Sequence, residues 1–186
     1  MALRGGAKIA LAMLIGVAGV AALVLGYGWW RASRHAAVTI RVDDLALRTS
    51  TQPYGAPRGV AITLRDDAGA VLATGRSVEP LGYIALAHPD PAIGTCEAVP
   101  PALRRDDYPA CHEQQARWAA TWAGRARSAD VAVGGCTIRD APLAVWHSNS
   151  EWLLWWVPLP HVGGLPHRYF DLSVAVDSAA CTAAKR

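Results

Sequence analysis

The longest apolar stretch of the chain is Ile9–Trp30, 22 residues without a charged side chain. At about 1.5 Å per residue, a helix of this length spans roughly 33 Å, which matches a hydrocarbon core of about 30 Å. Arg4 and Lys8 precede the stretch, and it ends in Tyr27 and two tryptophans, which is typical of the aromatic belt at a membrane interface. The pattern predicts an uncleaved transmembrane signal anchor.

Two alternatives to an anchor are a cleaved signal peptide and a buried helix of a soluble protein. A signal peptide has an apolar region of about 7–15 residues that ends in small residues at a cleavage site. This stretch is longer and ends in Gly-Tyr-Gly-Trp-Trp-Arg, so the anchor is favoured. The charges on its two sides nearly balance, since Arg31 and Arg34 follow it, and they indicate the orientation only weakly.

Beyond a short polar link at residues 31–37, apolar and polar residues alternate with the period of two that is typical of half-buried strands. Such strands are predicted at 38–43, 60–65, 71–76, 82–87, 131–133, 143–145 and 169–177. Asp66–Gly69 separates the second strand from the third, which predicts a β-hairpin. A single helix is predicted at 106–127, where Asp106 and Asp107 offer N-cap oxygens and Pro109 suits the first turn.

These elements predict an N-terminal transmembrane helix followed by a mainly-β domain with one inserted helix. We expect an antiparallel, β-sandwich-like α+β arrangement. The predicted organisation is a cytoplasmic flank at residues 1–8, the anchor at 9–30, the link at 31–37 and one domain at 38–186.

All four cysteines (Cys96, Cys111, Cys136 and Cys181) follow the anchor, without the spacing of a zinc or haem site. Two disulfides in an oxidising compartment are the simplest interpretation, and four reduced thiols in the cytosol are the alternative. Four cysteines allow three pairings, of which we favour Cys96–Cys111 and Cys136–Cys181. The prediction is therefore a bacterial inner-membrane protein with its C-terminal domain in the periplasm.

The charge balance limits the classes of partner. The 18 basic residues include Arg4 and Lys8, which leaves 16 basic and 15 acidic residues beyond the anchor, a net charge of +1. This part has no basic stripe for nucleic acid and no polybasic lipid-binding run along the sequence. We expect contact with the membrane through residues 9–30 and no nucleic-acid partner.

No sequence motif for catalysis is present: the chain has no Walker A loop, GxGxxG, HExxH or GxSxG. His161 and His167 flank a short turn region, and His88 and His147 lie elsewhere in the domain. A metal site needs three or four converging ligands, so each histidine is interpreted as a surface or turn residue. The sequence predicts no metal site, no cofactor and no catalytic residue.

The segment Glu151–Pro160, EWLLWWVPLP, is unusually rich in tryptophan. In a strand, Trp152 and Trp156 would share one face with Leu154, whereas Trp155 would share the other with Leu153, so both faces are apolar. One interpretation is a central strand covered on both sides. The other is a partner-binding patch, because tryptophan is enriched at binding hot spots and Pro158 and Pro160 favour a sheet edge.

The predicted patch comprises Trp152, Leu153, Leu154, Trp155 and Trp156, with Trp155 as the exposed tryptophan. From these features we expect a membrane-anchored periplasmic accessory, assembly or inhibitory binding protein of another cell-envelope protein. The alternative is an anchored periplasmic hydrolase of unknown substrate that uses His147, His161 or His167. A cleft that holds one of these histidines beside a carboxylate would favour the alternative.

Overall fold

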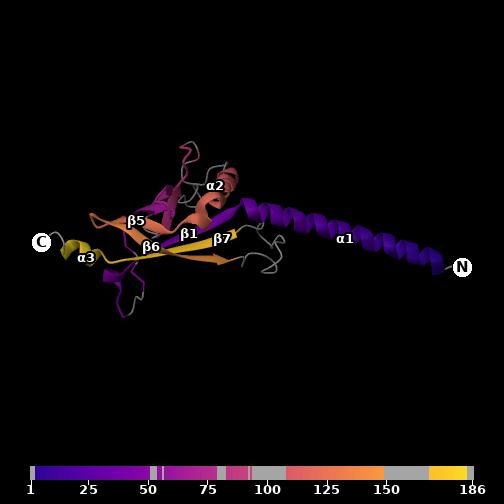
Figure 1. The fold of residues 1–186 in the computed structure, drawn as a ribbon, viewed down its shortest axis with the longest axis horizontal. Coiled ribbons are helices and arrows are strands. Elements are labelled where there is room, and N and C mark those ends of the chain that lie inside the picture. The colour runs from indigo at the N-terminus through magenta and orange to yellow at the C-terminus, as the bar shows by residue number, and fades with distance from the viewer. Residues whose placement is uncertain are drawn as a thin grey trace.

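The computed structural model describes residues 3–50, 54–55, 57–78, 83–91, 93, 108–148 and 168–183. Within these ranges, one long helix, α1 (Leu3–Arg34), projects from a domain that carries the strands (Figure 1). The two chain ends lie at opposite ends of the molecule, with the N-terminus at the tip of α1 and the C-terminus beyond the domain (Figure 1). Whatever holds α1 therefore holds the domain by one end.

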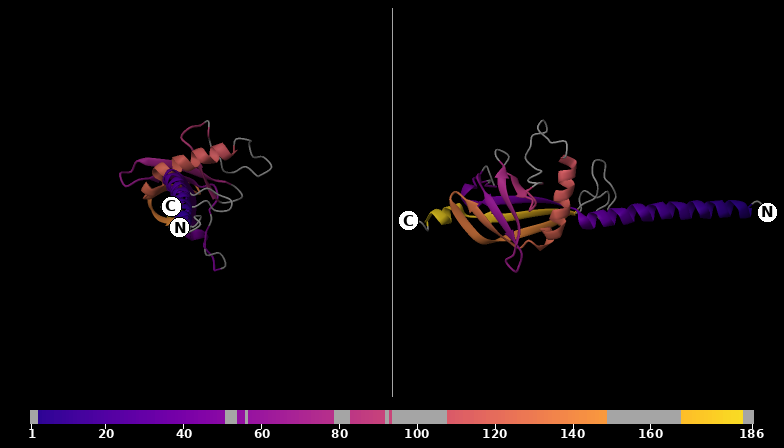
Figure 2. Two further views of the ribbon diagram at one scale, coloured as in Figure 1. Left: turned by 90° about the vertical axis from the view of Figure 1, so that its right-hand side faces the viewer. Right: turned by 90° about the horizontal axis from the view of Figure 1, so that it is seen from above.

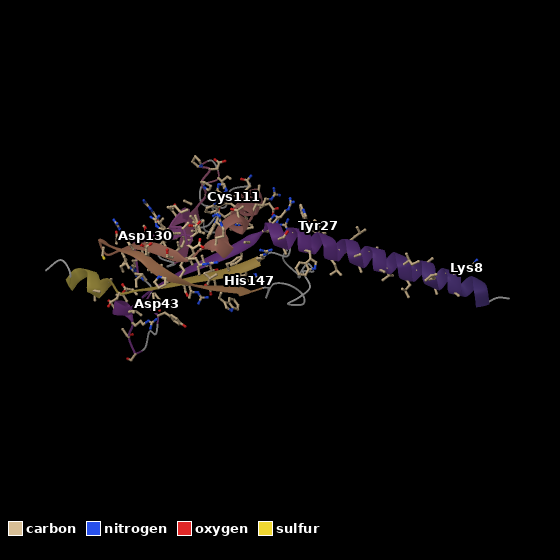
Figure 3. The ribbon with its side chains drawn as sticks, viewed as in Figure 1. Lys8, Tyr27, Asp43, Cys111, Asp130 and His147 are labelled. Atoms are coloured by element: carbon tan, nitrogen blue, oxygen red, sulfur yellow. The ribbon has the colours of Figure 1, made fainter. Side chains whose placement is uncertain are left out.

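Helix α1 exposes its apolar side chains along nearly its whole length. Leu11, Leu14 and Leu23 are 60%, 69% and 76% exposed, and the domain packs only against the last turns of the helix. Within the described residues, α1 is the helix that is long and apolar enough to cross a membrane. The predicted N-terminal apolar helix is confirmed, and Figure 3 shows Lys8 near its free end and Tyr27 near the domain.

The connection between α1 and the domain is one residue long. Helix α1 ends at Arg34 and strand β1 (Ala36–Asp44) begins two residues later, which leaves only His35 between them. The segment 31–37, which the sequence predicts as a polar link, therefore consists of the last turn of α1 and the start of β1. A flexible hinge does not fit into one residue whose side chain is buried.

The domain is built on one seven-stranded sheet. Its remaining strands are β2 (Ala61–Arg65), β3 (Val71–Val78), β4 (Tyr83–Ala87), β5 (Ser128–Val133), β6 (Cys136–Ser148) and β7 (Arg168–Val176). Their order is β1-β7-β6-β5-β2-β3-β4, and all neighbours are antiparallel except β1 and β7, which are parallel. The outermost strands, β1 and β4, contact each other, so the sheet is nearly closed.

Strand β6 makes this curvature possible because it pairs with a different strand along each half. Residues 136–142 pair with β5, whereas Leu143–Ser148 pair with β7. Asp140, shortly before the change of partner, has a φ of +50° and lies opposite a register shift between Ala129 and Val131. Irregularities of this kind bend a strand and increase its twist.

The prediction of a mainly-β domain with an inserted helix is confirmed, but the predicted sandwich is not what forms. Two stacked sheets are replaced by one curved sheet, because β6 continues from one half into the other. The purely antiparallel pattern is also wrong at one place, since the first strand pairs in parallel with the last. Alternation along a strand shows which side is buried and does not show which strand lies next to it.

The interior of the sheet is filled by alternating strand residues. Phe170, Leu172, Val174 and Val176 of β7 are all buried, as the alternation predicts. The predicted hairpin forms between β2 and β3, with Leu64 fully buried. The sheet therefore encloses a core of aliphatic side chains.

The inserted helix α2 (Tyr108–Trp122) covers one end of this core. It is shorter than the predicted helix at its C-terminal end, where Ala123–Arg125 form a 3-10 turn, η3. Trp122 is 2% exposed in the core, and Trp118 packs against it with ring centroids 5.4 Å apart. Figure 2 shows α2 crossing the molecule next to the end of α1.

The end of the domain farthest from α1 is organised by Asp44, which is 1% exposed. Its carboxylate accepts hydrogen bonds from the backbone amides of Ala46, in the 3-10 turn η1 (Leu45–Leu47), and of Ser178. Ser178 begins the short helix α3 (Ser178–Ala183). One buried carboxylate thus joins the end of β1 to the last helix of the chain.

Several predicted residues lie outside the description. These are Cys96 and the tryptophan segment at 151–160, together with His161 and His167. Cys181 falls within α3, just past the end of β7. Among the described residues, neither Cys111 nor Cys136 is a free thiol. The two pairings remain predictions, because the part of the chain that the structure describes tests neither of them.

Candidate functional site at the junction of helix and domain

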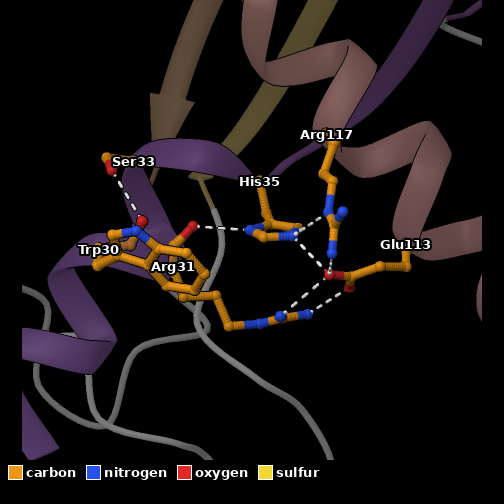
Figure 4. A network of polar contacts seen from close by, with 6 residues as sticks. All are labelled: Trp30, Arg31, Ser33, His35, Glu113 and Arg117. Carbon is orange, nitrogen blue, oxygen red and sulfur yellow. Dashed lines mark hydrogen bonds and ion pairs between the residues drawn. The ribbon is translucent and has the colours of Figure 1, made fainter.

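A compact polar network joins the end of α1 to α2 (Figure 4). At its centre, the Glu113 carboxylate of α2 binds the Arg31 guanidinium of α1 through two contacts, of 3.2 Å to Oε1 and 2.6 Å to Oε2. Oε1 also lies 2.7 Å from His35 Nε2 and accepts a 3.0 Å hydrogen bond from Arg117. One carboxylate therefore has three cationic or potentially cationic partners.

Local structure places each of these side chains. Arg31 in the last turn of α1 and His35 just after it lie four residues apart, and Glu113 and Arg117 have the same spacing on α2. Residues with this spacing lie on one face of a helix, so two helical faces meet. On α1, Gly28 and Ala32 are buried beside His35, and their small size lets the domain approach the helix axis closely.

The two ring nitrogens of His35 face different partners. Nδ1 lies 2.9 Å from the Arg31 carbonyl oxygen, which can only accept, so Nδ1 donates. Glu113 is ionised, because its pKa is lowered to about 2. The Arg31 hydrogen bond is the main cause; burial opposes it, and His35 and Arg117 add to the lowering. Nε2 faces the ionised Glu113 carboxylate at 2.7 Å, so the His35 ring lies between the Arg31 carbonyl oxygen and Glu113.

The side chains that connect α1 to α2 are partly or fully buried, except for Arg117. The His35 side chain is 3% exposed and that of Arg31 is 14% exposed, whereas Glu113 and Arg117 are 28% and 63% exposed. Charged hydrogen bonds between partly buried groups are stronger than those on an open surface. The network therefore links the end of α1 to α2 through partly buried contacts.

Aromatic side chains continue the junction along α1. Tyr27 stacks on Trp30 with ring centroids 5.8 Å apart, and the Arg34 guanidinium lies 5.0 Å from the Trp30 ring centroid. Trp29 and Trp30 are 56% and 47% exposed. The last turns of α1 thus present aromatic rings and a cation outward while their other side packs on the domain.

A second feature is an exposed apolar section of β6 near the same end of the domain. Val145 is 37% exposed and Trp146 is 59% exposed. Trp146 is paired in register with Asp171, three residues along β7 from its first residue, Arg168. It is the one exposed tryptophan of the domain in the part of the chain that the structure describes.

The histidines considered from the sequence do not converge where they are described. His147 is exposed on β6 with its ring tilted against that of Phe170, and His88 lies edge-on to Trp118. Over the described ranges, no three His, Cys, Asp or Glu side chains are grouped as metal ligands would be. His161 and His167 lie outside the described residues, so the structure does not test the hydrolase alternative.

An open groove of about 590 Å³ lies on the outer face of β2, β5 and β6. Thr63, Arg65, Asp130, Thr137 and Arg139 are among its lining residues. The Arg65 guanidinium is held by Asp130 at 2.8 Å and by the Gly69 carbonyl oxygen. Figure 3 shows Asp130 far from Tyr27 and α1, so the groove and the junction are separate features.

Sequence reasoning missed the junction network. Glu113 and Arg117 have the i, i+4 spacing of a helical ion pair, which is a readable signal. No signal in the sequence joins them to Arg31 and His35, which are 82 and 78 residues away from Glu113. The predicted patch, Trp152–Trp156, lies outside the described residues and remains a prediction.

Comparison of the chain with protein-family models, curated proteins and solved structures found no match. The function proposed below therefore rests on the junction, the exposed section of β6 and the sequence.

Proposed function

We propose that the chain is a single-pass protein of the bacterial inner membrane whose periplasmic domain is an accessory, assembly or inhibitory partner of another cell-envelope protein. The domain would sit directly on the membrane at a set orientation. Its partner would be a protein that also lies at the membrane surface, within reach of a domain that cannot swing away.

The junction network is the observation that carries this proposal. A domain that only needs to be retained at a membrane can hang on a flexible link, as Gly- and Ser-rich linkers allow. Here one buried residue, His35, separates helix from strand. Glu113 of α2 binds both this residue and Arg31 in the last turn of α1. A fixed orientation is useful when a particular face must meet a partner in the same membrane.

The exposed section of β6 is the face that we assign to this partner. Trp146 lies near the junction, and the predicted patch begins only a few residues after β6 ends at Ser148. Exposed aromatic residues supply much of the energy of protein interfaces. We propose that Trp146 and the predicted patch, Trp152–Trp156, belong to one binding surface.

The periplasmic location rests on the cysteines. Neither Cys111 nor Cys136 is free among the described residues, which supports the proposal of Cys96–Cys111 and Cys136–Cys181 disulfides. A 15-residue loop closed by the first of these would stabilise the fold by about 3 kcal/mol in the chain-entropy model. Peptide mapping without reduction tests the pairings. Free thiols at all four positions would place the domain in a reducing compartment.

Site-specific photo-crosslinking in intact membranes tests the partner surface. A photoreactive phenylalanine analogue is introduced at Trp146 or Trp155 of the full chain, and at Val71 as the control, because Val71 is 55% exposed on β3. We expect one discrete adduct of defined mass from Trp146 and Trp155 and none from Val71. Equal adducts at all three positions, or none at any of them, would refute a specific partner surface.

A further inference from the structure

Four arginines gather at the end of α1, although they come from three elements far apart in the sequence. Arg31 and Arg34 close α1, Arg117 lies on α2 and Arg168 begins β7. The Arg168 backbone amide donates to the His35 carbonyl oxygen at 3.0 Å, and Arg117 Nε lies 3.4 Å from His35 Nε2. These contacts bring the three elements together at His35, and we define the arginine cluster as Arg31, Arg34, Arg117 and Arg168.

The positive charge of this cluster exceeds the negative charge of the acidic side chain bound to it. Glu113 is the acidic side chain bound within it among the described residues, so four positive charges and one negative charge leave +3. Arg31 is mostly covered, at 14% exposure, and is occupied by Glu113. Arg34 and Arg168 are exposed, and Arg117 is 63% exposed. Three guanidinium groups therefore face solvent beside the apolar helix.

The aromatic residues of α1 indicate the depth at which the cluster would lie in a bilayer. Tyr27, Trp29 and Trp30 are each about half exposed, and such rings favour the headgroup level of a membrane. The Arg34 guanidinium lies 5.0 Å from the Trp30 ring, so this charge is held at the same level. The single-residue connection at His35 keeps α2 and β7 from moving away, and Figure 2 shows α2 beside the end of α1.

We propose that the arginine cluster binds the phosphate groups of anionic phospholipids in the outer leaflet of the membrane that α1 crosses. Guanidinium groups bind phosphate through paired hydrogen bonds. A zwitterionic headgroup carries its own cation, which competes for the phosphate, so we expect weaker binding to it. Continuity with the apolar helix favours a lipid over a free anion, because the cluster begins where the apolar surface ends. This inference rests on the proposed membrane anchoring and adds a lipid preference to it.

Lipid retention by the full chain tests the proposal. The protein is reconstituted into vesicles with equal amounts of phosphatidylglycerol and phosphatidylcholine, and the lipids that stay bound are counted by native mass spectrometry. An arginine near an anionic surface favours binding by about fivefold. We expect phosphatidylglycerol to exceed phosphatidylcholine by at least fivefold, and the double variant Arg34→Gln/Arg168→Gln to lower this ratio at least fivefold.

The control is Arg76→Gln/Arg139→Gln, which removes the same charge from exposed positions on β3 and β6. A ratio that falls equally in both double variants would overturn the proposal, since net charge alone would then explain it. Inorganic phosphate is the second arm: displacement of phosphatidylglycerol by phosphate, but not by chloride of equal ionic strength, would assign the cluster to a free anion instead. Carbonate extraction tests anchoring separately, since a chain that is extracted would refute the proposed function whatever the lipid ratio.

Discussion

Replacing Glu113 by Gln is the sharpest perturbation of the junction. The two side chains have nearly the same size, so the substitution removes the negative charge with little change in packing. Arg31 and Arg117 then lose the carboxylate that neutralises them, and His35 loses its carboxylate partner. The Arg31 and His35 side chains are largely buried. We expect the domain to lose stability and α1 to lose its firm contact with α2.

The expected loss follows from the pKa of Glu113. A fall from 4.5 to about 2 corresponds to about 3.4 kcal/mol of favourable interaction with the ionised carboxylate, at 1.36 kcal/mol per pKa unit. Because the side chain is 28% exposed, solvent screening reduces this to about 2–3 kcal/mol. That is a large part of the 5–15 kcal/mol that holds a typical domain folded.

The sign of the pH dependence is set by the direction of the shift. The folded pKa is lower than the unfolded one, so the contribution is fully present above about pH 4.5 and is lost as the pH falls towards 2. Wild type and Glu113→Gln should therefore differ at pH 7 and converge near pH 2. The slope of stability against pH between these values should be smaller in the variant.

Chemical unfolding of the full chain in detergent micelles, followed by near-ultraviolet circular dichroism at pH 7 and at several acidic values, provides the measurement. Asp67→Asn is the matched control, because Asp67 is an exposed turn residue and the substitution also removes one negative charge. A difference below about 0.5 kcal/mol between wild type and Glu113→Gln at pH 7 would refute the reasoning. So would a difference that stays constant down to pH 2.

Two further predictions concern the domain itself. Asp44→Ala should cost about 2–4 kcal/mol, because it removes a buried carboxylate that accepts from the backbone amides of Ala46 and Ser178. Urea unfolding measures this, and a loss below about 1 kcal/mol would show that water replaces the carboxylate. Leu172→Ala should cost about 2–5 kcal/mol because Leu172 is fully buried, whereas Leu45→Ala, at 45% exposure, should change the stability by less than about 0.5 kcal/mol. Equal effects in the two leucine variants would contradict the assigned core.

Local patterns predicted the parts of the fold that depend on neighbouring residues. The hairpin of β2 and β3 follows from two alternating segments around Asp66–Gly69, and Gly69 adopts the positive φ that the turn needs. The buried face of β7 follows from strict alternation. Both features depend on the order of apolar and polar residues within a short window of sequence, so the sequence alone is sufficient to predict them.

The predicted sandwich failed for the opposite reason. Strand β6 changes its partner from β5 to β7 near Asp140, and β1 lies beside β7 although more than a hundred residues separate them in the chain. The alternation of apolar and polar residues within these strands does not indicate either pairing. Closure of the sheet depends on which strands meet, and this is decided by packing of the whole core.

By itself, the sequence determined the long apolar helix, because 22 consecutive uncharged residues are a property of composition and need no partner. It also showed that no run of basic residues follows the helix. Only the tertiary structure brought Arg117 and the Arg168 backbone against His35 at the end of α1, and Glu113 against Arg31. Charge acts over distances in space, whereas a scan of the sequence measures distances along the chain, so the junction and its arginine cluster become visible only in the folded protein.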